Sequence, residues 1–362
     1  MVEIKIIGRE YNQRMREIIS SNPMITPNYD LLFDKGPDFF VSEHIWPIKL
    51  TYYGIFEDNL LVGMGSHSAY NGYLNGEEII YNHFGNFCVD AQYQNQGLFN
   101  KLSSFMAQNV ITSDNLGFAQ IIKGNKAPER YFTVEDIPLE GMPRYKRRIE
   151  LVSKTLLLIW KKRPVKGFDV RFATEEDLKR IISFLEEEYP KRTMAFSFRA
   201  DWFQNKINGD YDLCIKDYLL VFKEGKLVGL CGVWDMKSIK RTKILRYKGR
   251  MKVVYHLLKL KLNLPKPGSN FKELYLTDLI IKNEDADILK ALLVGINNYY
   301  ITKGYLLVHF SSYKNSPMLS GSSLFFGFKM FSNIFFKSND ATIIKPFDSC
   351  KTFTPYFDIS YM

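Results

Sequence analysis

The fold is decided by the stretch Val89-Asp-Ala-Gln-Tyr-Gln-Asn-Gln-Gly-Leu-Phe-Asn-Lys-Leu102. A strand-like segment ends at Val89, a polar loop containing Gly97 follows, and a helix then begins with apolar residues at helical spacing. Such a junction exposes unpaired backbone N–H groups at the positive end of the helix dipole, which predicts an anion site. Gly97 lets a phosphate approach the backbone, and Asn95 tolerates the positive φ that such turns need. A plain β–α connection that binds nothing is the alternative.

A weak internal repeat organises the rest of the chain. Residues 56–64 (FEDNLLVGM) match residues 222–230 (FKEGKLVGL) at an offset of 166, and each segment predicts a β-hairpin with a polar turn. The same offset relates the alternating segments 3–6 and 169–172, each of which leads into a charged, helix-like segment. Chance similarity is the alternative to a repeat.

The offset grows to 192 further along, where the strand-like segments 81–89 and 273–281 match, so the second copy carries about 26 inserted residues. A helix and another strand follow in each copy, and the order β, α, β-hairpin, β, α, β predicts an α/β fold with a mixed sheet in each half. Basic residues, Pro and Gly at 161–167 predict a linker. We therefore expect one domain over 1–160 and a second over 168–362.

The loop sequence resembles the acetyl-CoA signature of the GCN5-related N-acetyltransferase (GNAT) superfamily, usually (Gln/Arg)-x-x-Gly-x-(Gly/Ala). Gln94 and Gly97 match this pattern, whereas Phe99 stands where Gly or Ala is usual. The element order of residues 1–158 is similar to the same fold. The matching segment of the second half, 282–289, has no Gln/Arg…Gly pair, and its Asp and Glu would repel a pyrophosphate. The chain thus resembles a tandem GNAT protein with one cofactor-competent half.

The resemblance implies which residues bind acetyl-CoA, the acyl donor. The backbone of the strand before the signature would bind the pantetheine arm, and the N–H groups of the loop would hold the pyrophosphate. These residues are Phe87, Cys88 and Val89 on the strand and Gln94, Asn95, Gln96, Gly97, Leu98 and Phe99 in the loop. Family members often have an Asn near the pantetheine and a Tyr that protonates the departing thiolate. Asn125 matches the Asn, and Tyr131, one residue short of the usual spacing, is the candidate acid or a tyrosine packed on the sheet.

The chemistry of acyl transfer needs a proton acceptor, because an amine attacks a thioester only when neutral. His83, on the strand that leads to the predicted cofactor site, is the candidate base, and a structural histidine is the alternative. Cys88 has no partnered base in the sequence, so direct attack of the amine in a ternary complex fits better than an acyl-enzyme. The aromatic segment 33–40, with Asp38, would line the amine pocket or cover the sheet edge.

The positive charge is concentrated in one segment. The 362 residues include 49 Lys and Arg against 39 Asp and Glu, which gives a net charge of +10. Eleven of the basic residues and no acidic residue lie in the insertion 236–266, so the rest of the chain is nearly neutral. This segment contains a helix-like stretch at 251–262. Three interpretations are open: a solvated face of a helix packed on the second domain, a site for a polyanion such as RNA or an acidic protein, or a surface for anionic membrane.

Several classes are disfavoured by the sequence. The start of the chain has no apolar core of a signal peptide, and no run of about 18 apolar residues predicts a membrane span. The four cysteines and five histidines show no metal-ligand spacing, so we expect no metal and a reduced, cytoplasmic setting.

The leading hypothesis is an N-acetyltransferase that moves the acetyl group of acetyl-CoA to a primary amine of a small molecule or peptide. The second half would shape the acceptor site or form a homodimer. The alternatives are a tRNA-dependent aminoacyl transferase of the peptidoglycan-bridge (Fem-like) type, in which the basic segment would hold tRNA, and a non-catalytic acyl-CoA-binding regulator.

Overall fold

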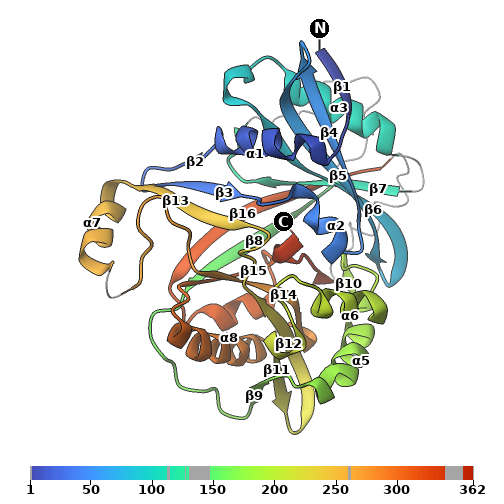
Figure 1. Cartoon of the computed structure of the whole chain (residues 1–362). Helices are drawn as coiled ribbons and strands as arrows, with labels where there is room; N and C mark the ends of the chain where they lie inside the picture. Colours follow the sequence, from blue (N-terminus) through green and yellow to red (C-terminus); the bar gives the residue numbers. More distant parts are fainter. Residues whose placement is uncertain are drawn as a thin grey trace.

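A single mixed sheet runs through both halves of the chain (Figure 1). The computed structural model describes residues 2–111, 115–126, 128–129, 147–259, 262–338 and 354–361. Within these residues, twelve strands form the sheet in the order β1-β4-β5-β6-β7-β16-β8-β15-β14-β12-β11-β9. They are β1 (Val2–Ile7), β4 (Lys49–Glu57), β5 (Leu60–Leu74), β6 (Glu77–Val89), β7 (Asn115–Ile122), β8 (Arg147–Leu157), β9 (Asp169–Phe172), β11 (Tyr218–Lys223), β12 (Lys226–Trp234), β14 (Glu273–Ile281), β15 (Leu307–Tyr313) and β16 (Gly327–Lys337). The predicted α/β class with a mixed sheet is confirmed.

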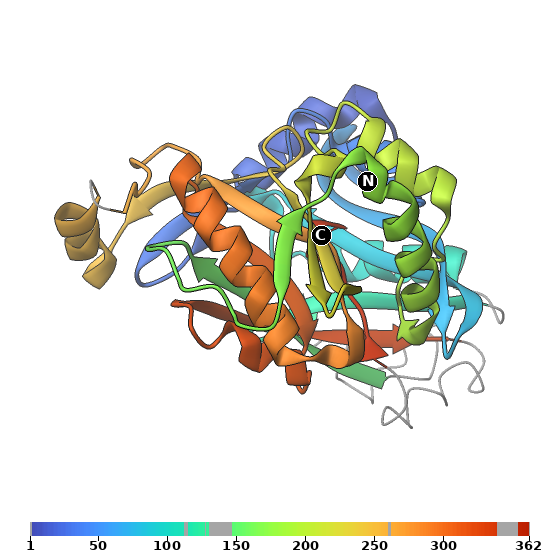
Figure 2. The ribbon, with the colours of Figure 1, turned by 90° about the horizontal axis from the view of Figure 1, so that it is seen from below.

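Helices cover this sheet, and a smaller sheet extends from it. The helices are α1 (Asn12–Ser20), α2 (Ser42–Ile45), α3 (Leu98–Val110), α5 (Leu178–Glu188), α6 (Ala200–Asn208), α7 (Gly249–Leu258) and α8 (Ala286–Tyr300). The smaller sheet has the order β13 (Arg241–Tyr247), β3 (Tyr29–Asp34), β2 (Met24–Ile25), and β10 (Arg192–Thr193) pairs with β17 (Thr354–Pro355). The smaller sheet and α7, which we call the arm, project from the body in both Figure 1 and Figure 2.

The repeat extends to backbone irregularities. The turns Asp58-Asn59 and Glu224-Gly225 join the two predicted hairpins, and all four residues have positive φ, as the twist of hairpin strands favours. Near each turn the ladder shifts register at equivalent positions. A further equivalent pair, Asn86 and Asp278, has φ of 53° and 49° in the middle of β6 and β14. Irregularities that recur at matching positions support a structural repeat.

The two halves exchange one strand each. β8, from the first half, pairs with β15 of the second half, and β16, from the second half, lies between β7 and β8. The halves therefore share one sheet, an arrangement that the sequence did not predict. The division into units over 1–160 and 168–362 stays a prediction. Its boundary falls in the segment between β8 and β9, which belongs to no strand.

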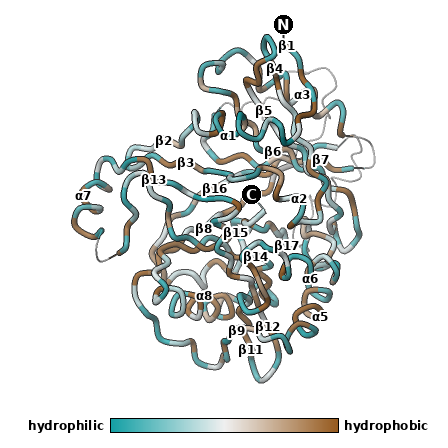
Figure 3. Tube along the Cα trace, viewed as in Figure 1, coloured by the Kyte–Doolittle hydropathy of each residue, from teal (hydrophilic) through white to brown (hydrophobic). Residues whose placement is uncertain are grey.

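The largest hydrophobic cluster also joins the halves and is rich in aromatic rings. Trp46 of the first half stacks on Phe196 of the second with ring centroids 5.6 Å apart, and Trp234 lies 6.1 Å from Trp46. Each fully buried large side chain contributes on the order of 1.5–3 kcal/mol to folding. Figure 3 shows the hydrophobic segments gathered in the central strands and along α8.

Candidate functional site

β6 and β7 diverge at their carboxyl ends. They pair in parallel from Ile80↔Asn115 to Phe84↔Ala119 only, although β6 continues to Val89. The edge of residues 85–89 that faces β7 therefore lies outside the ladder. This edge contains Phe87, Cys88 and Val89, the residues predicted to bind the pantetheine arm.

A β-bulge sits at the point of divergence. Asn86 and Phe87 together oppose Gly65 of β5, and Asn86 has φ of 53°. A Cβ at Gly65 would lie 2.8 Å from the ring of Phe87, so glycine makes room for this ring. Bulges bend a strand and re-aim its side chains, which is consistent with the opening between β6 and β7.

The loop after β6 leads into the exposed N-terminus of α3. Asn95 has φ of 65°, as the sequence predicted, and Gly97 has φ of 72°. Gly97 is the N-cap of α3, and among the described residues no side chain caps this helix end. A Cβ on Gly97 would meet no atom within 4 Å, so there is open space beside the helix N-terminus. Gln94, Asn95, Gln96 and Gly97 are all exposed.

Side chains behind the loop hold its shape. Asp90 accepts hydrogen bonds from the backbone N–H of Gln92 at 3.1 Å and from Arg14 at 2.7 Å. The amide of Gln94 donates to Asn22 at 2.6 Å. Gln94 therefore anchors the loop through its side chain.

Cys88 is a protonated, half-buried thiol. Its Sγ lies 3.8 Å from the carbonyl oxygen of Ile18. Burial, with a smaller effect from Asp90, raises the pKa of Cys88 to about 11. A thiol in this state is a weak nucleophile at neutral pH.

His83 lies on the opposite face of the sheet from α3. Its ring stacks on Phe118 with centroids 4.8 Å apart and lies 5.5 Å from the ring of Tyr361. Burial, with a smaller effect from Lys35, lowers the pKa of His83 to about 3. His83 is therefore neutral at physiological pH and is a weak proton acceptor.

Two lysines that the sequence analysis did not select lie on this side of the sheet, Lys35 near His83 and Lys240 near Lys35. Lys35 donates a hydrogen bond to the Oδ1 of Asn86, and Asn86 donates to the hydroxyl of Ser66 at 2.8 Å. Burial lowers the pKa of Lys35 to about 8, and burial together with Lys35 lowers the pKa of Lys240 to about 7. Lys35 belongs to the selected segment 33–40 and Lys240 to the basic insertion, but nothing in the sequence indicates that they converge.

The fold matches solved structures over nearly the whole chain, whereas no protein-family model and no curated protein sequence matches. N-myristoyltransferase of Saccharomyces cerevisiae with bound myristoyl-CoA superposes with a TM-score of 0.60 at 12% identity, over 93% of this chain and 82% of that one. A tandem GNAT protein from the clavulanic acid biosynthesis pathway gives 0.56 at 10% identity, over 94% and 99%. The chain has the tandem GNAT fold. A GCN5-related N-acetyltransferase from Sphaerobacter thermophilus gives the same TM-score of 0.56 at 9% identity, over 99% and 98%.

In the second half, strands β14 and β15 diverge in the same way, but side chains of the protein occupy the region beyond their pairing. β14 and β15 pair only from Glu273↔Leu307 to Tyr275↔His309. Asp278 then forms an ion pair with Lys206 at 2.8 Å, with both side chains fully buried.

Further side chains complete this buried network. Asp278 also accepts hydrogen bonds from the hydroxyls of Tyr189 and Tyr218, both at 2.5 Å. Asp358, from the C-terminal segment, accepts from Thr277 at 2.8 Å and from the backbone N–H of Asp278 at 2.9 Å. The region equivalent to residues 85–89 is thus occupied by the chain's own side chains.

The helix N-terminus of the second half is also covered. Asp285 caps α8 by accepting from the N–H of Asp287 at 2.8 Å. The 3-10 helix Pro317–Ser322 packs on the start of α8 so closely that a Cβ at Gly321 would lie 2.1 Å from the oxygen of Ala286. Only the first half offers an open loop at this position among the residues that the structure describes.

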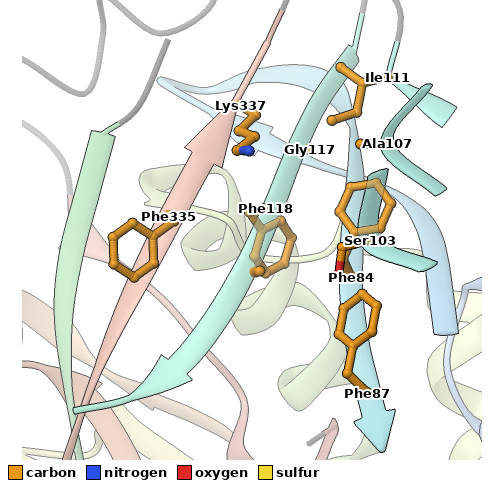
Figure 4. Close-up of a pocket in the computed structure, with 10 residues that line it drawn as sticks. Phe84, Phe87, Ser103, Ala107, Ile111, Gly117, Phe118, Phe335 and Lys337 are labelled. Atoms are coloured by element: carbon orange, nitrogen blue, oxygen red, sulfur yellow. The ribbon is translucent and has the colours of Figure 1, made fainter. Parts of the chain in front are cut away.

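Two cavities lie on opposite faces of the sheet near the first site. The smaller, about 20 Å³, lies between α3 and the sheet and is lined mainly by rings and small side chains, with Phe84 and Phe87 from β6 and Ser103 from α3 (Figure 4). The hydroxyl of Ser103 is buried there with no hydrogen-bond partner in the described part of the chain. The larger, about 1390 Å³, lies between the arm and the other face of the sheet, and both Lys35 and Lys240 line it.

The remaining predicted site residues fall in different places. Asn125 lies in the turn after β7, where its N–H donates to Ile122 at 3.0 Å. Tyr131 lies outside the described residues. The carboxylate of Asp38 accepts a hydrogen bond from the backbone N–H of Phe40 at 2.9 Å and forms an ion pair with Arg9. Both contacts stabilise the local structure of the segment 33–40.

The basic insertion forms part of the arm. β13 pairs with β3, and Arg241 bonds Asp34 at 2.9 Å, while Arg246 and Lys248 pair with Asp30 at 2.9 and 2.6 Å. Part of its charge is therefore neutralised by the first half. The predicted helix forms as α7, where none of the residues is fully buried and Tyr255 stacks on Tyr247 of β13 with ring centroids 4.5 Å apart.

Two features are absent from the part of the chain that the structure describes. None of the helices there is long and apolar enough to cross a membrane. No group of three or more His, Cys, Asp or Glu side chains is gathered there as a metal site would require.

Proposed function

We propose that the chain is an acyl-CoA-dependent N-acyltransferase whose first half holds the donor, and that the acyl group is acetyl. One observation carries the proposal: the diverging strands β6 and β7 lie beside the open N-terminus of α3 in the first half, and the equivalent region of the second half is filled. Solved structures with this fold include one that holds myristoyl-CoA, which supports an acyl-CoA donor. The cavity of about 20 Å³ beside α3 suits a short acyl group.

In this proposal the donor is held mainly by backbone. The N–H groups from Gln94 to Phe99 would bind the pyrophosphate, because a helix N-terminus with positive φ at Gly97 presents several donors to an anion. The backbone edge of Phe87, Cys88 and Val89, which does not pair with β7, would bind the pantetheine arm. Asn125, at the end of β7, would lie beside that arm.

Transfer would proceed by direct attack. The neutral amine nitrogen attacks the thioester carbonyl carbon, the C–S bond breaks, and the amine proton passes to a base. Backbone N–H groups at the bulge would stabilise the oxyanion. The protonated state of Cys88 disfavours an acyl-enzyme. Tyr131 stays the predicted acid for the leaving thiolate.

Lys35 is a stronger candidate base than His83. Lys35 contacts Asn86 at the divergence and has a pKa of about 8, so part of it is neutral at physiological pH. The prediction that His83 removes the proton stays open to test, although a pKa of about 3 makes its ring a poor acceptor.

A matched pair of variants tests the donor site. Gly97→Asp places a carboxylate where the pyrophosphate would bind, and we expect acetyl-CoA affinity to fall by at least about tenfold, or 1.4 kcal/mol. Gly225→Asp is the control, because Gly225 also has positive φ (74°) and open space for a Cβ. Equal loss of binding in both variants, measured by calorimetry on folded protein, would contradict the proposed site.

A further inference from the structure

We propose that the cavity between the arm and the sheet binds a long aliphatic chain, and that this chain belongs to the acceptor amine. The assignment to the acceptor rests on the proposed function, whereas binding of the chain does not.

The size and lining of the cavity indicate a large apolar ligand. Its volume of about 1390 Å³ exceeds the roughly 300–1,000 Å³ of ordinary small-molecule sites. Apolar side chains line it from both sides, among them Leu31, Phe33 and Ile244 from the arm and Leu157, Phe328 and Met330 from the sheet. An aliphatic chain seated against these side chains would remove apolar surface from water.

Helix α7 has an apolar face that the described residues cover only in part. Met251, Val254 and Leu258 point into the cavity, yet no residue of α7 is buried. Phe33 and Phe326, which also line the cavity, are 51% and 62% exposed. An exposed apolar patch of this extent in a concave surface marks a binding site, and an aliphatic chain would cover it.

The polar groups of the cavity suit an amine head. Glu273 accepts from the backbone N–H of Thr242 at 2.8 Å and bonds His309 at 3.0 Å, so its carboxylate is fixed in the cavity wall. Lys35 and Lys240 line the same cavity, and like charges favour the neutral form of a neighbouring amine. The contact of Lys35 with Asn86 connects the cavity to the divergence where the thioester would lie.

The placement of the two cavities favours the acceptor as the source of the chain. Thr155 and Phe328 are ladder partners on the face of the sheet that carries the large cavity. Leu156 points to the other face, where it packs in the cluster with α8. The small cavity lies beside α3, the donor helix. A short acyl group and a long acceptor would therefore meet from opposite faces at β6.

Binding is tested with the full chain and dansyl-undecanoic acid, whose fluorescence rises in apolar surroundings. We expect the probe to bind and dodecylamine to displace it, whereas butylamine does not. A second experiment adds lauroyl-CoA as the competitor of the probe. Displacement by lauroyl-CoA but not by dodecylamine would overturn the assignment to the acceptor, and absence of probe binding would overturn the aliphatic site itself.

Neighbouring residues of α7 provide a matched pair of variants. Val254→Glu puts a charge into the cavity and should weaken probe binding, and acetyl transfer to dodecylamine, by at least tenfold. Val253→Glu, on a side chain that is 60% exposed and does not line the cavity, should change neither. Equal effects of both variants would overturn the proposal. Loss of acetyl-CoA binding with intact probe binding would instead contradict the proposed function.

Discussion

At the scale of single residues, Lys35 makes the sharpest prediction. A lysine base works only when neutral, so the rate should rise with pH through its pKa of about 8 and level off above it. Lys35→Met should lower kcat/KM by about 10²–10⁴-fold, the usual contribution of a general base, and remove this limb of the pH profile. Lys123→Met is the control, because Lys123 lines the same cavity but is exposed at the end of β7.

His83 provides the opposing prediction. Since burial lowers the pKa of His83 to about 3, His83→Gln should leave the shape of the pH profile between about 5 and 9 unchanged, whatever it does to the rate. Disappearance of a limb near 6.5 in the His83→Gln profile, with the Lys35→Met profile unchanged, would make His83 the base instead.

The buried pair in the second half predicts a stability effect. Lys206→Met leaves the buried carboxyl of Asp278 without its ion-pair partner, and removal of one partner of such a pair costs about 3–5 kcal/mol. Urea unfolding should report this loss, and acetyl-CoA affinity should be nearly unchanged at temperatures where the variant stays folded. The double variant Lys206→Met with Asp278→Leu should regain part of the stability. A single variant as stable as the parent would show that the pair is not buried.

At the scale of elements, structures formed by residues close in sequence could be predicted, whereas pairings between distant strands could not. The hairpin at Asp58-Asn59 and the positive φ of Asn95 follow from residues adjacent in sequence, so the sequence predicted both. The exchange of β8 and β16 depends on partners more than 150 residues apart, as in Ser153↔Ser311, and periodicity does not encode such partners. The loop of the proposed donor site could therefore be predicted from the sequence. The arm that brings Lys240 toward Lys35 could not.

At the scale of the whole molecule, the exchanged strands predict that the two halves unfold together. β16 is bonded to β7 and β8, and Lys206 of the second half lies 4.2 Å from the ring centroid of Trp46 of the first half. Neither half keeps a complete sheet or core alone. Scanning calorimetry should show one cooperative transition, and two resolved transitions would indicate independent domains.

The central claim is that only the first half holds an acyl-CoA, and the stoichiometry of acetyl-CoA binding tests it most directly. Isothermal titration calorimetry on the full chain should give one acetyl-CoA per chain, and Gly97→Asp should weaken that binding by at least about tenfold without exposing a second site. Two molecules per chain, unchanged affinity in Gly97→Asp, or no binding to the parent protein would contradict this claim.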